Sequence, residues 1–333
     1  MKPRASLRIP ASALAVLCLL LSGCAAPVQL PPDAPNRTLE LHSVPFHPQE
    51  RFQCGPAALA TVLGAAGVRV TPAELVDEVW IPDRQGALAT ELAAAARRRG
   101  RLAYRIDPRP GALLGELEAG HPVLVMQNLG VSWFPRWHFA VVIGFDPEAR
   151  TVILRSGTER RRLTPLATFD ATWARADRWG LVLPEPGSLP ANPDRERLLE
   201  AAAALERAGH ADVAHGVYAR WLESHPSDPA ARFGLAVTAT ALGRPELAAQ
   251  AYETLLAQRP GDIRALNNLA LVRAQQGCIG AARELLAGAR RESGGKRIGE
   301  ILETTAAEIE AAAAGREQDC PAGIAGQDAV RSP

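Results

Sequence analysis

A 34-residue period in the second half of the 333-residue chain restricts the fold more than any other feature. Glycine, alanine and proline each recur at this interval: Gly209, Gly243 and Gly277, then Ala214, Ala248 and Ala282, then Pro226 and Pro260. Alanine lets two helices approach closely, glycine suits the turn between them, and proline ends a helix. The period therefore predicts stacked helix pairs, each burying its apolar face against the next.

This helix–turn–helix period resembles the tetratricopeptide repeat. The resemblance implies three repeats at 195–228, 229–262 and 263–296, with a surface that binds a protein partner. The amphipathic segment 297–314 predicts a capping helix, and we expect 315–333 to form a disordered tail. Four prolines within 183–194 predict a linker before the repeats, with its core at 185–194.

The first 23 residues have the pattern of an export signal. Three basic residues precede the apolar run Ile9 to Leu21, which is shorter than the ~20 residues of a spanning helix. The run ends in Leu21-Ser22-Gly23-Cys24, which resembles the lipobox of bacterial lipoproteins. The resemblance implies cleavage before Cys24 and its lipidation. Because Ala25 follows, it also implies sorting to the periplasmic side of the Gram-negative outer membrane, with 24–40 as a flexible tether.

Composition excludes several classes of protein. The net charge is +1, and it becomes −2 when the three basic residues of 1–23 are removed. Aromatic residues make up 5% of the chain, so neither a basic field nor aromatic stacking indicates a nucleic-acid partner. No His, Cys or Asp cluster has metal-ligand spacing, and no cofactor motif is present, so we expect neither a metal nor a cofactor.

Residues 41–184 mix helical and strand patterns. Helices are predicted at 54–67, from Pro72, at about 88–99, at 111–119 and at 165–175, with a capping box at Thr71 and Glu74. Strands are predicted at 102–106, 123–127, 139–145, 152–155, 160–163 and 181–183. Helices first and strands afterwards is the order typical of an α+β domain.

Cys54 is the cysteine that calls for a chemical explanation. Cys278 and Cys320 are free to pair with each other, which leaves Cys54 as an odd thiol in an exported chain. It opens a predicted helix, where the helix N–H groups favour the thiolate, and Gly55 leaves clearance beside the sulfur. A cysteine nucleophile also needs a base, and His138 lies at the start of an apolar strand, where a base is expected. Trp80, Trp133 and Trp137 are predicted to pack in the core, with a place along a substrate groove as the alternative.

These residues resemble the papain-like peptidases of the bacteriocin-processing, double-glycine type. The match rests on Gln49, on Cys54-Gly55 and on His138-Phe139 with the following valines, and it covers about 41–184. It implies an α+β papain-like domain in which Cys54 is the nucleophile, His138 is the base and Gln49 belongs to the oxyanion hole. We expect the Cys54 sulfur within about 3–4.5 Å of a His138 ring nitrogen.

One member of the family's catalytic set is missing. The family places an aspartate about sixteen residues after the histidine, and here the nearest position holds Ser156. Counting back along the predicted hairpin puts Ser156 level with 138–140, whereas Asp146 lies over ~20 Å up the strand. Ser156, Asp146 and a backbone carbonyl remain alternatives for orienting His138.

Three functions remain open on the sequence alone. The first is a tethered periplasmic cysteine peptidase whose repeats recruit a peptide or protein. The second is a papain-like domain without activity in a scaffold lipoprotein. The third is amide transfer or deamidation, which the same nucleophile and base support.

Overall fold

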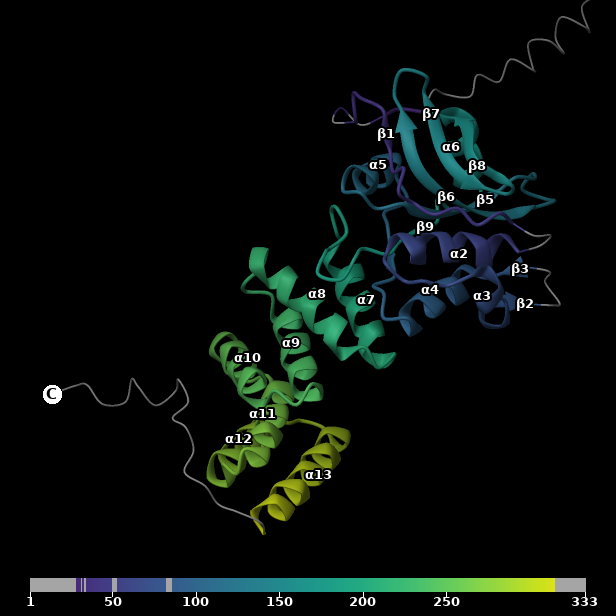
Figure 1. The fold of residues 1–333 in the computed structure, drawn as a ribbon. Coiled ribbons are helices and arrows are strands. Elements are labelled where there is room, and N and C mark those ends of the chain that lie inside the picture. Colours follow the sequence, from purple (N-terminus) through teal and green to yellow (C-terminus); the bar gives the residue numbers. More distant parts are fainter. Residues whose placement is uncertain (1–27, 31, 33, 50–52, 82–85, 315–333) are drawn as a thin grey trace, which may run out of the picture.

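The computed structural model describes residues 28–30, 32, 34–49, 53–81 and 86–314. An α/β domain is followed by a column of helices, and Figure 1 shows the two arranged one beyond the other. Among the described residues, no helix is long and apolar enough to cross a membrane. The predicted signal at 1–23, the lipidation site at Cys24 and the tail at 315–333 lie outside the described residues.

The first domain is built on a seven-stranded antiparallel sheet with the order β4-β9-β5-β6-β7-β8, and β1 pairs with the far end of β6. The strands are β1 Leu39–Glu40, β4 Tyr104–Arg105, β5 Val123–Asn128, β6 Trp137–Asp146, β7 Thr151–Ser156, β8 Glu159–Pro165 and β9 Gly180–Val182. A separate small hairpin joins β2 Trp80–Ile81 to β3 Gly86–Ala87. The predicted longer strands are all present, and the two-residue strands β1 to β3 were not predicted.

Helices cover both faces of this sheet. The helices α2 Cys54–Ala65, α3 Pro72–Val79 and α4 Ala89–Arg98 share one buried cluster with Phe139, Val141 and Ile143 of β6. The helices α5 Pro110–Glu118 and α6 Leu166–Ala174 cover the other face, where their apolar side chains meet Ala140 and Val142. The predicted capping box at Thr71 and Glu74 starts α3. The predicted α+β fold class is confirmed.

The second part consists of seven helices among the described residues. They are α7 Arg195–Arg207, α8 Ala211–Ser224, α9 Pro229–Ala241, α10 Pro245–Gln258, α11 Ile263–Gln275, α12 Ile279–Glu292 and α13 Lys296–Ala313. Six of them lie within 195–296 as three pairs, as predicted, and α13 packs on the last pair. The recurrent glycines at 209, 243 and 277 all have positive φ, which explains the residue type at these turns. Three aspartates cap the first helix of each pair, namely Asp194, Asp228 and Asp262.

Ala248 tests this helix packing. The side chain is fully buried on α10 within a cluster that includes Ala265 and Leu269 of the next pair. We expect Ala248→Leu to overpack this contact and to lower the free energy of unfolding by about 1–3 kcal/mol. Ala257→Leu, on an exposed position of the same helix, is the control for the added methyl groups. Equal melting temperatures for the two variants would show that Ala248 has room to spare.

The segments on either side of the first domain pack more firmly than their composition suggests. Residues 24–40 were predicted to be a flexible tether, but Val28, Leu30, Ala34 and Leu39 pack against the core. Arg150 also donates a hydrogen bond to the Val28 carbonyl over 2.8 Å. The prediction is therefore wrong for the described part of this segment. Its prolines favour extended backbone, which lies readily along a folded surface, and the apolar residues between them bury area there.

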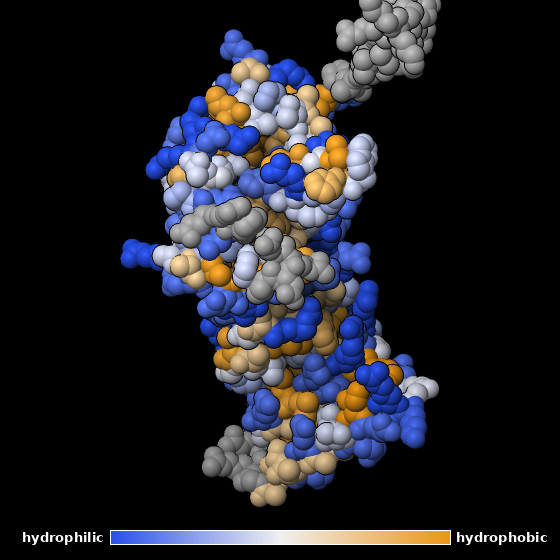
Figure 2. Space-filling model, turned by 90° about the vertical axis from the view of Figure 1, so that its right-hand side faces the viewer, coloured by the Kyte–Doolittle hydropathy of each residue, from blue (hydrophilic) through white to orange (hydrophobic). Residues whose placement is uncertain are grey.

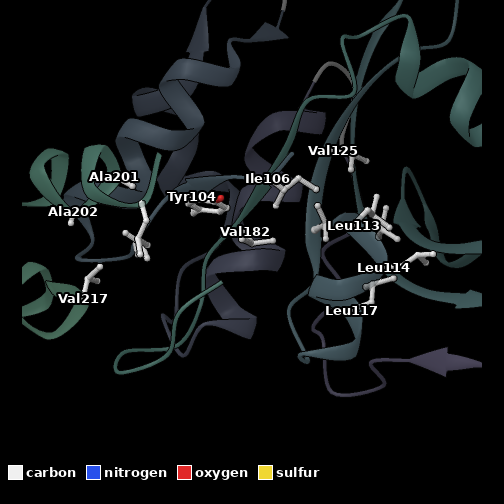
Figure 3. Close-up of a cluster of buried hydrophobic side chains, with 14 of the residues drawn as sticks. Tyr104, Ile106, Leu113, Leu114, Leu117, Val125, Val182, Ala201, Ala202 and Val217 are labelled. Carbon is white, nitrogen blue, oxygen red and sulfur yellow. The ribbon is translucent and has the colours of Figure 1, made fainter. Parts of the chain in front are cut away.

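The predicted linker joins the two parts without separating them. Buried Glu116 accepts hydrogen bonds from the Ala191 backbone N–H over 3.2 Å, and the Tyr104 hydroxyl accepts one from the Asp194 N–H over 2.9 Å. One apolar cluster runs from the sheet into the first repeat, and Figure 3 shows Tyr104 and Val182 beside Ala201, Ala202 and Val217. The first repeat thus shares a buried core with the α/β domain.

Candidate active site

Cys54 is the first residue of α2, so its sulfur lies at the positive end of that helix. The sulfur accepts a backbone hydrogen bond from the N–H of Phe139, the residue that follows His138 on β6. Gly55 lets β3 pack against the start of α2, because a Cβ at that position would lie 2.5 Å from the Cβ of Ala87. The predicted clearance at Gly55 is therefore used by the Ala87 side chain of β3.

Burial sets the protonation state of the thiol. It raises the pKa of Cys54 above its ordinary value, and hydrogen bonds from the Phe139 and Gly55 backbones oppose this shift only in part. At neutral pH the thiol is therefore protonated in the free protein. The helix N-terminus alone does not produce a resting thiolate, in contrast to the expectation from the sequence.

His138 lies at the second position of β6, and its Nε2 atom is 2.8 Å from the hydroxyl oxygen of Ser156 on β7. Burial, with a smaller effect from the nearby Arg162 charge, lowers the pKa of His138 to about 4. The ring is therefore neutral at pH 7 and available as a base. If Nε2 carries the proton it donates to Ser156, and Nδ1 is then the acceptor.

A β-bulge places Ser156 on the same side of the sheet as His138. Near the turn Asp146 pairs with Thr151, but the register shifts between Val142 and Gly144, so Val141 pairs with Arg155. Ser156 is then level with Ala140, which shares its sheet face with His138. Without the shift Ser156 would lie opposite Val141 and point to the other face. The Ser156 interaction expected from the hairpin count is thus present.

Asp146 is remote from the histidine. It is the last residue of β6, eight positions beyond His138, and its carboxylate accepts the N–H of Ala149 in the turn over 2.9 Å. This agrees with the expected exclusion of Asp146 as the orienting group.

A small pocket brings Gln49, Cys54 and Ser156 together, whereas His138 is not among the residues that line it. It encloses about 230 Å³, its open mouth included, and it is lined by His47, Gln49, Cys54, Ala57, Ala58, Thr61, Phe139, Arg155, Ser156 and Gly157. The Gln49 backbone N–H donates to the Gly157 carbonyl over 3.0 Å, which holds this glutamine at the pocket. Among the described residues no hydrogen bond joins the His138 ring to the sulfur, so the expected 3–4.5 Å separation stays a prediction.

Sequence reasoning missed two residues of this pocket. His47 precedes the first predicted helix and has no predicted strand to hold it, and Arg155 was considered only as the end of the predicted strand 152–155. Both reach the pocket through the tertiary fold, since 41–49 runs along the end of β7. Burial lowers the pKa of His47, so its ring is also neutral at pH 7.

The loop between β5 and β6 exposes aromatic side chains beside this site. Trp133 is 85% exposed and Trp137 is 54% exposed, so the prediction of core packing is wrong for both. Hydrogen bonds at the base of the loop explain the exposure. The Asn128 side-chain oxygen accepts the N–H groups of Gly130 and Arg136, and this turns the chain outward. Figure 2 shows that hydrophobic patches on the face seen there are small and separated by hydrophilic side chains.

The two pKa shifts predict the pH dependence of Cys54 alkylation. Since burial raises the thiol pKa, the thiolate fraction increases with pH throughout the neutral range. We expect the rate with iodoacetamide to rise steadily from pH 6 to pH 9. A thiolate paired with a histidinium would instead give a rate already at its plateau at pH 6, and that outcome would contradict the assigned protonation states.

The described residues contain no group of three or more His, Cys, Asp or Glu side chains suited to a metal ion. The site offers the Cys54 thiol at the start of a helix and the neutral imidazole of His138. His138 directly precedes Phe139, whose N–H donates to the sulfur. Gln49 adds an amide to the pocket. A cysteine at the start of a helix that packs on an antiparallel sheet, with a histidine on the facing strand, is an arrangement that suits the class of the cysteine peptidases.

Comparisons with known proteins support this class. Residues 41–180 match the Peptidase_C39 like family, and residues 199–263 and 240–296 match the Tetratricopeptide repeat family. The chain thus carries a C39-like peptidase domain followed by tetratricopeptide repeats.

Two solved structures are similar to parts of the chain. A Bacillus anthracis protein described as a putative C39-like peptidase is 18% identical, with a TM-score of 0.38 over 44% of this chain and 98% of its own. The Sgt2 TPR domain from Aspergillus fumigatus is 24% identical, with a TM-score of 0.33 over 42% and 95%. No curated protein matches the chain.

Proposed function

We propose that this protein is a thiol hydrolase, and specifically a cysteine peptidase that cleaves a peptide or protein recruited by its repeats. The observation that carries the proposal is the hydrogen bond to the Cys54 sulfur from the residue next to His138, whose ring is held by Ser156. A nucleophile, a neutral base and a group that orients the base are the minimal parts of such a site.

The protonation states define the first chemical step. As the Cys54 sulfur attacks the substrate carbonyl carbon, its proton passes to Nδ1 of the neutral His138 ring. The carbonyl oxygen gains negative charge, which the Cys54 backbone N–H and the Gln49 side-chain amide stabilise. The imidazolium then gives its proton to the departing amine. Water, deprotonated by His138, releases the acyl group from the sulfur and restores the thiol.

Ser156 influences the activation barrier of the attack by Cys54. Its hydroxyl fixes the ring through Nε2 but adds no negative charge to stabilise the imidazolium. Arg162 acts against the imidazolium, since its charge lowers the pKa of His138 further. We therefore expect slow turnover relative to a site with a carboxylate in this position.

The location of the protein is also part of the proposal. The lipobox at 21–24 would attach a lipid to Cys24 and hold the peptidase domain on the periplasmic side of the outer membrane. Val28, four residues further along, is fixed to the domain by Arg150. A span of four residues reaches at most about 14 Å, so the domain would lie close to the bilayer surface.

Cleavage assays on the whole mature chain test the peptidase activity. The protein is incubated with a mixture of unstructured polypeptides, and new termini are identified by mass spectrometry. New termini that are absent with Cys54→Ala support the proposal. A wild-type protein that cleaves nothing, and whose Cys54 reacts with iodoacetamide no faster than a buried thiol, would exclude it.

Cys24→Ser tests the attachment. We expect this variant, expressed in a Gram-negative host, to move from the membrane fraction to the soluble periplasmic fraction with unchanged thermal stability. The lipid is the only anchor that the sequence motif provides, which is the reason for complete release. A processed variant that remained with the membrane would reveal a second attachment.

A scaffold role without catalysis is the second candidate. It is favoured by the serine in place of an acidic residue and by the raised pKa of the Cys54 thiol. In that case the repeats would bind the same partner while Cys54 stays inert. Amide transfer or deamidation would use the same residues as peptide hydrolysis. The mass of the product distinguishes these three reactions.

A further inference from the structure

Arg155 is a buried cation at the pocket of Cys54. The residue is 6% exposed and pairs with Val141 in the sheet, so its side chain lies on the face that α2 covers. One terminal nitrogen donates to the Val44 carbonyl over 3.0 Å, and the other donates to the Arg160 carbonyl. Both partners are neutral backbone groups.

The charge of Arg155 has no carboxylate partner among the described residues. Its Nε atom is buried and makes no hydrogen bond there, although the side chain lines the same pocket as Cys54 and Gln49. The nearest acidic group that acts on it, Glu40, is already bound by Arg161 over 2.9 Å. Arg160 adds further positive charge. A buried cation without an opposite charge is costly, so its presence at a pocket calls for an explanation, and a bound anion supplies one.

We propose that Arg155 binds a carboxylate of the substrate, and that this pocket selects peptides with a carboxylate next to the bond attacked by Cys54. This rests on the proposed thiol hydrolase function and adds a substrate class to it. The planar guanidinium suits a carboxylate, and its Nε–H is among the N–H donors that the Val44 and Arg160 carbonyls do not use. Because Nε is buried, a carboxylate reaches it only if the pocket widens as the carboxylate enters.

Matched pairs of alkylating reagents test this without knowledge of the substrate. Cys54 is alkylated with iodoacetate and iodoacetamide, and with 3-bromopropionate and 3-bromopropionamide, and the Cys54 peptide is quantified by mass spectrometry. N-acetylcysteine amide gives the intrinsic acid-to-amide rate ratio. In the wild-type chain we expect the acid-to-amide rate ratio of at least one reagent pair to be about tenfold above the intrinsic ratio. The rate with the acid reagent should also saturate as its concentration increases.

Variants assign the effect to Arg155. Arg155→Gln is expected to return the ratio to the intrinsic value while the rate with the amide reagent changes less than threefold. Arg160→Gln, which removes an exposed charge nearby and keeps the backbone carbonyl, should retain the ratio. If Arg155→Gln fails to fold, two measurements on the wild-type chain test carboxylate binding instead. They are the saturation of the alkylation rate by the acid reagent and the protection of Cys54 from alkylation by unreactive carboxylates. Protection by N-acetylalanine indicates a terminal carboxylate, and protection by N-acetylglutamate α-amide indicates an acidic side chain.

The proposal would be overturned if both reagent pairs gave, in the folded wild-type protein, the same acid-to-amide rate ratio as N-acetylcysteine amide. Equal loss of both rates in Arg155→Gln would also overturn it, because it would show that Arg155 only ties the Val44 segment to the sheet. The proposed hydrolase function fails separately, through an amide-reagent rate that does not depend on His138.

Discussion

His138→Ala is expected to reduce peptide cleavage by about 10²–10⁴-fold, the range associated with loss of a general base. The reason lies in the protonation states. Burial keeps the Cys54 thiol protonated at pH 7, so attack requires a nearby acceptor for its proton. His138 is neutral above about pH 4 and lies one residue from the N–H that contacts the sulfur. Initial rates of cleavage and of iodoacetamide labelling measure the loss.

His47→Ala is the matched control for this experiment. His47 lines the pocket of Cys54 and is also neutral at pH 7, but it has no strand to fix it and its ring has no hydrogen-bond partner among the described residues. We expect its removal to change the cleavage rate less than fivefold. A large loss with His47→Ala and a small one with His138→Ala, in folded proteins, would transfer the role of the base to His47.

The fold was predictable where a regular pattern is imposed by burial. The 34-residue period fixes the helix pairs because alanines such as Ala248 and Ala282 must lie at the contact between helices. The strands β5 to β7 were predicted within about two residues since their apolar runs are buried. Two-residue strands such as β1 have no period, and β1 pairs with β6 at a point where Gly144 lets the Leu39 carbonyl approach.

The site was predictable only along single strands and helices. A helix start identified Cys54, and a strand start identified His138. Counting along the hairpin found Ser156, although the bulge that turns it to the side of His138 has no sequence signal beyond Gly144. The positions of His47 and Arg155 depend on how 41–49 crosses the end of β7, which is a tertiary contact. The periodic aspartates at 194, 228 and 262 were a local signal that the repeat analysis left unused.

Ser156→Asp is expected to increase the rate of cleavage about tenfold at pH 7. A carboxylate 4–6 Å from an imidazolium raises the pKa of histidine by 1–3 units, and one unit corresponds to a factor of ten. The present pKa of about 4 makes His138 a weak base, so moving this value toward neutrality improves proton transfer. Ser156→Ala should lower the rate only modestly, because the ring loses a hydrogen bond but no opposite charge.

Ser156→Asn separates charge from geometry in this series. Its amide oxygen can accept the Nε2 proton as a carboxylate does, but it supplies no negative charge. If charge is what the natural site lacks, Asn should resemble serine, and only Asp should increase the rate and move the acid limb of the pH profile upward. A gain with Asn equal to that with Asp would attribute the effect to ring orientation. Loss of all activity in a folded Asp146→Ala variant would contradict the hairpin register, since Asp146 lies at the far end of β6.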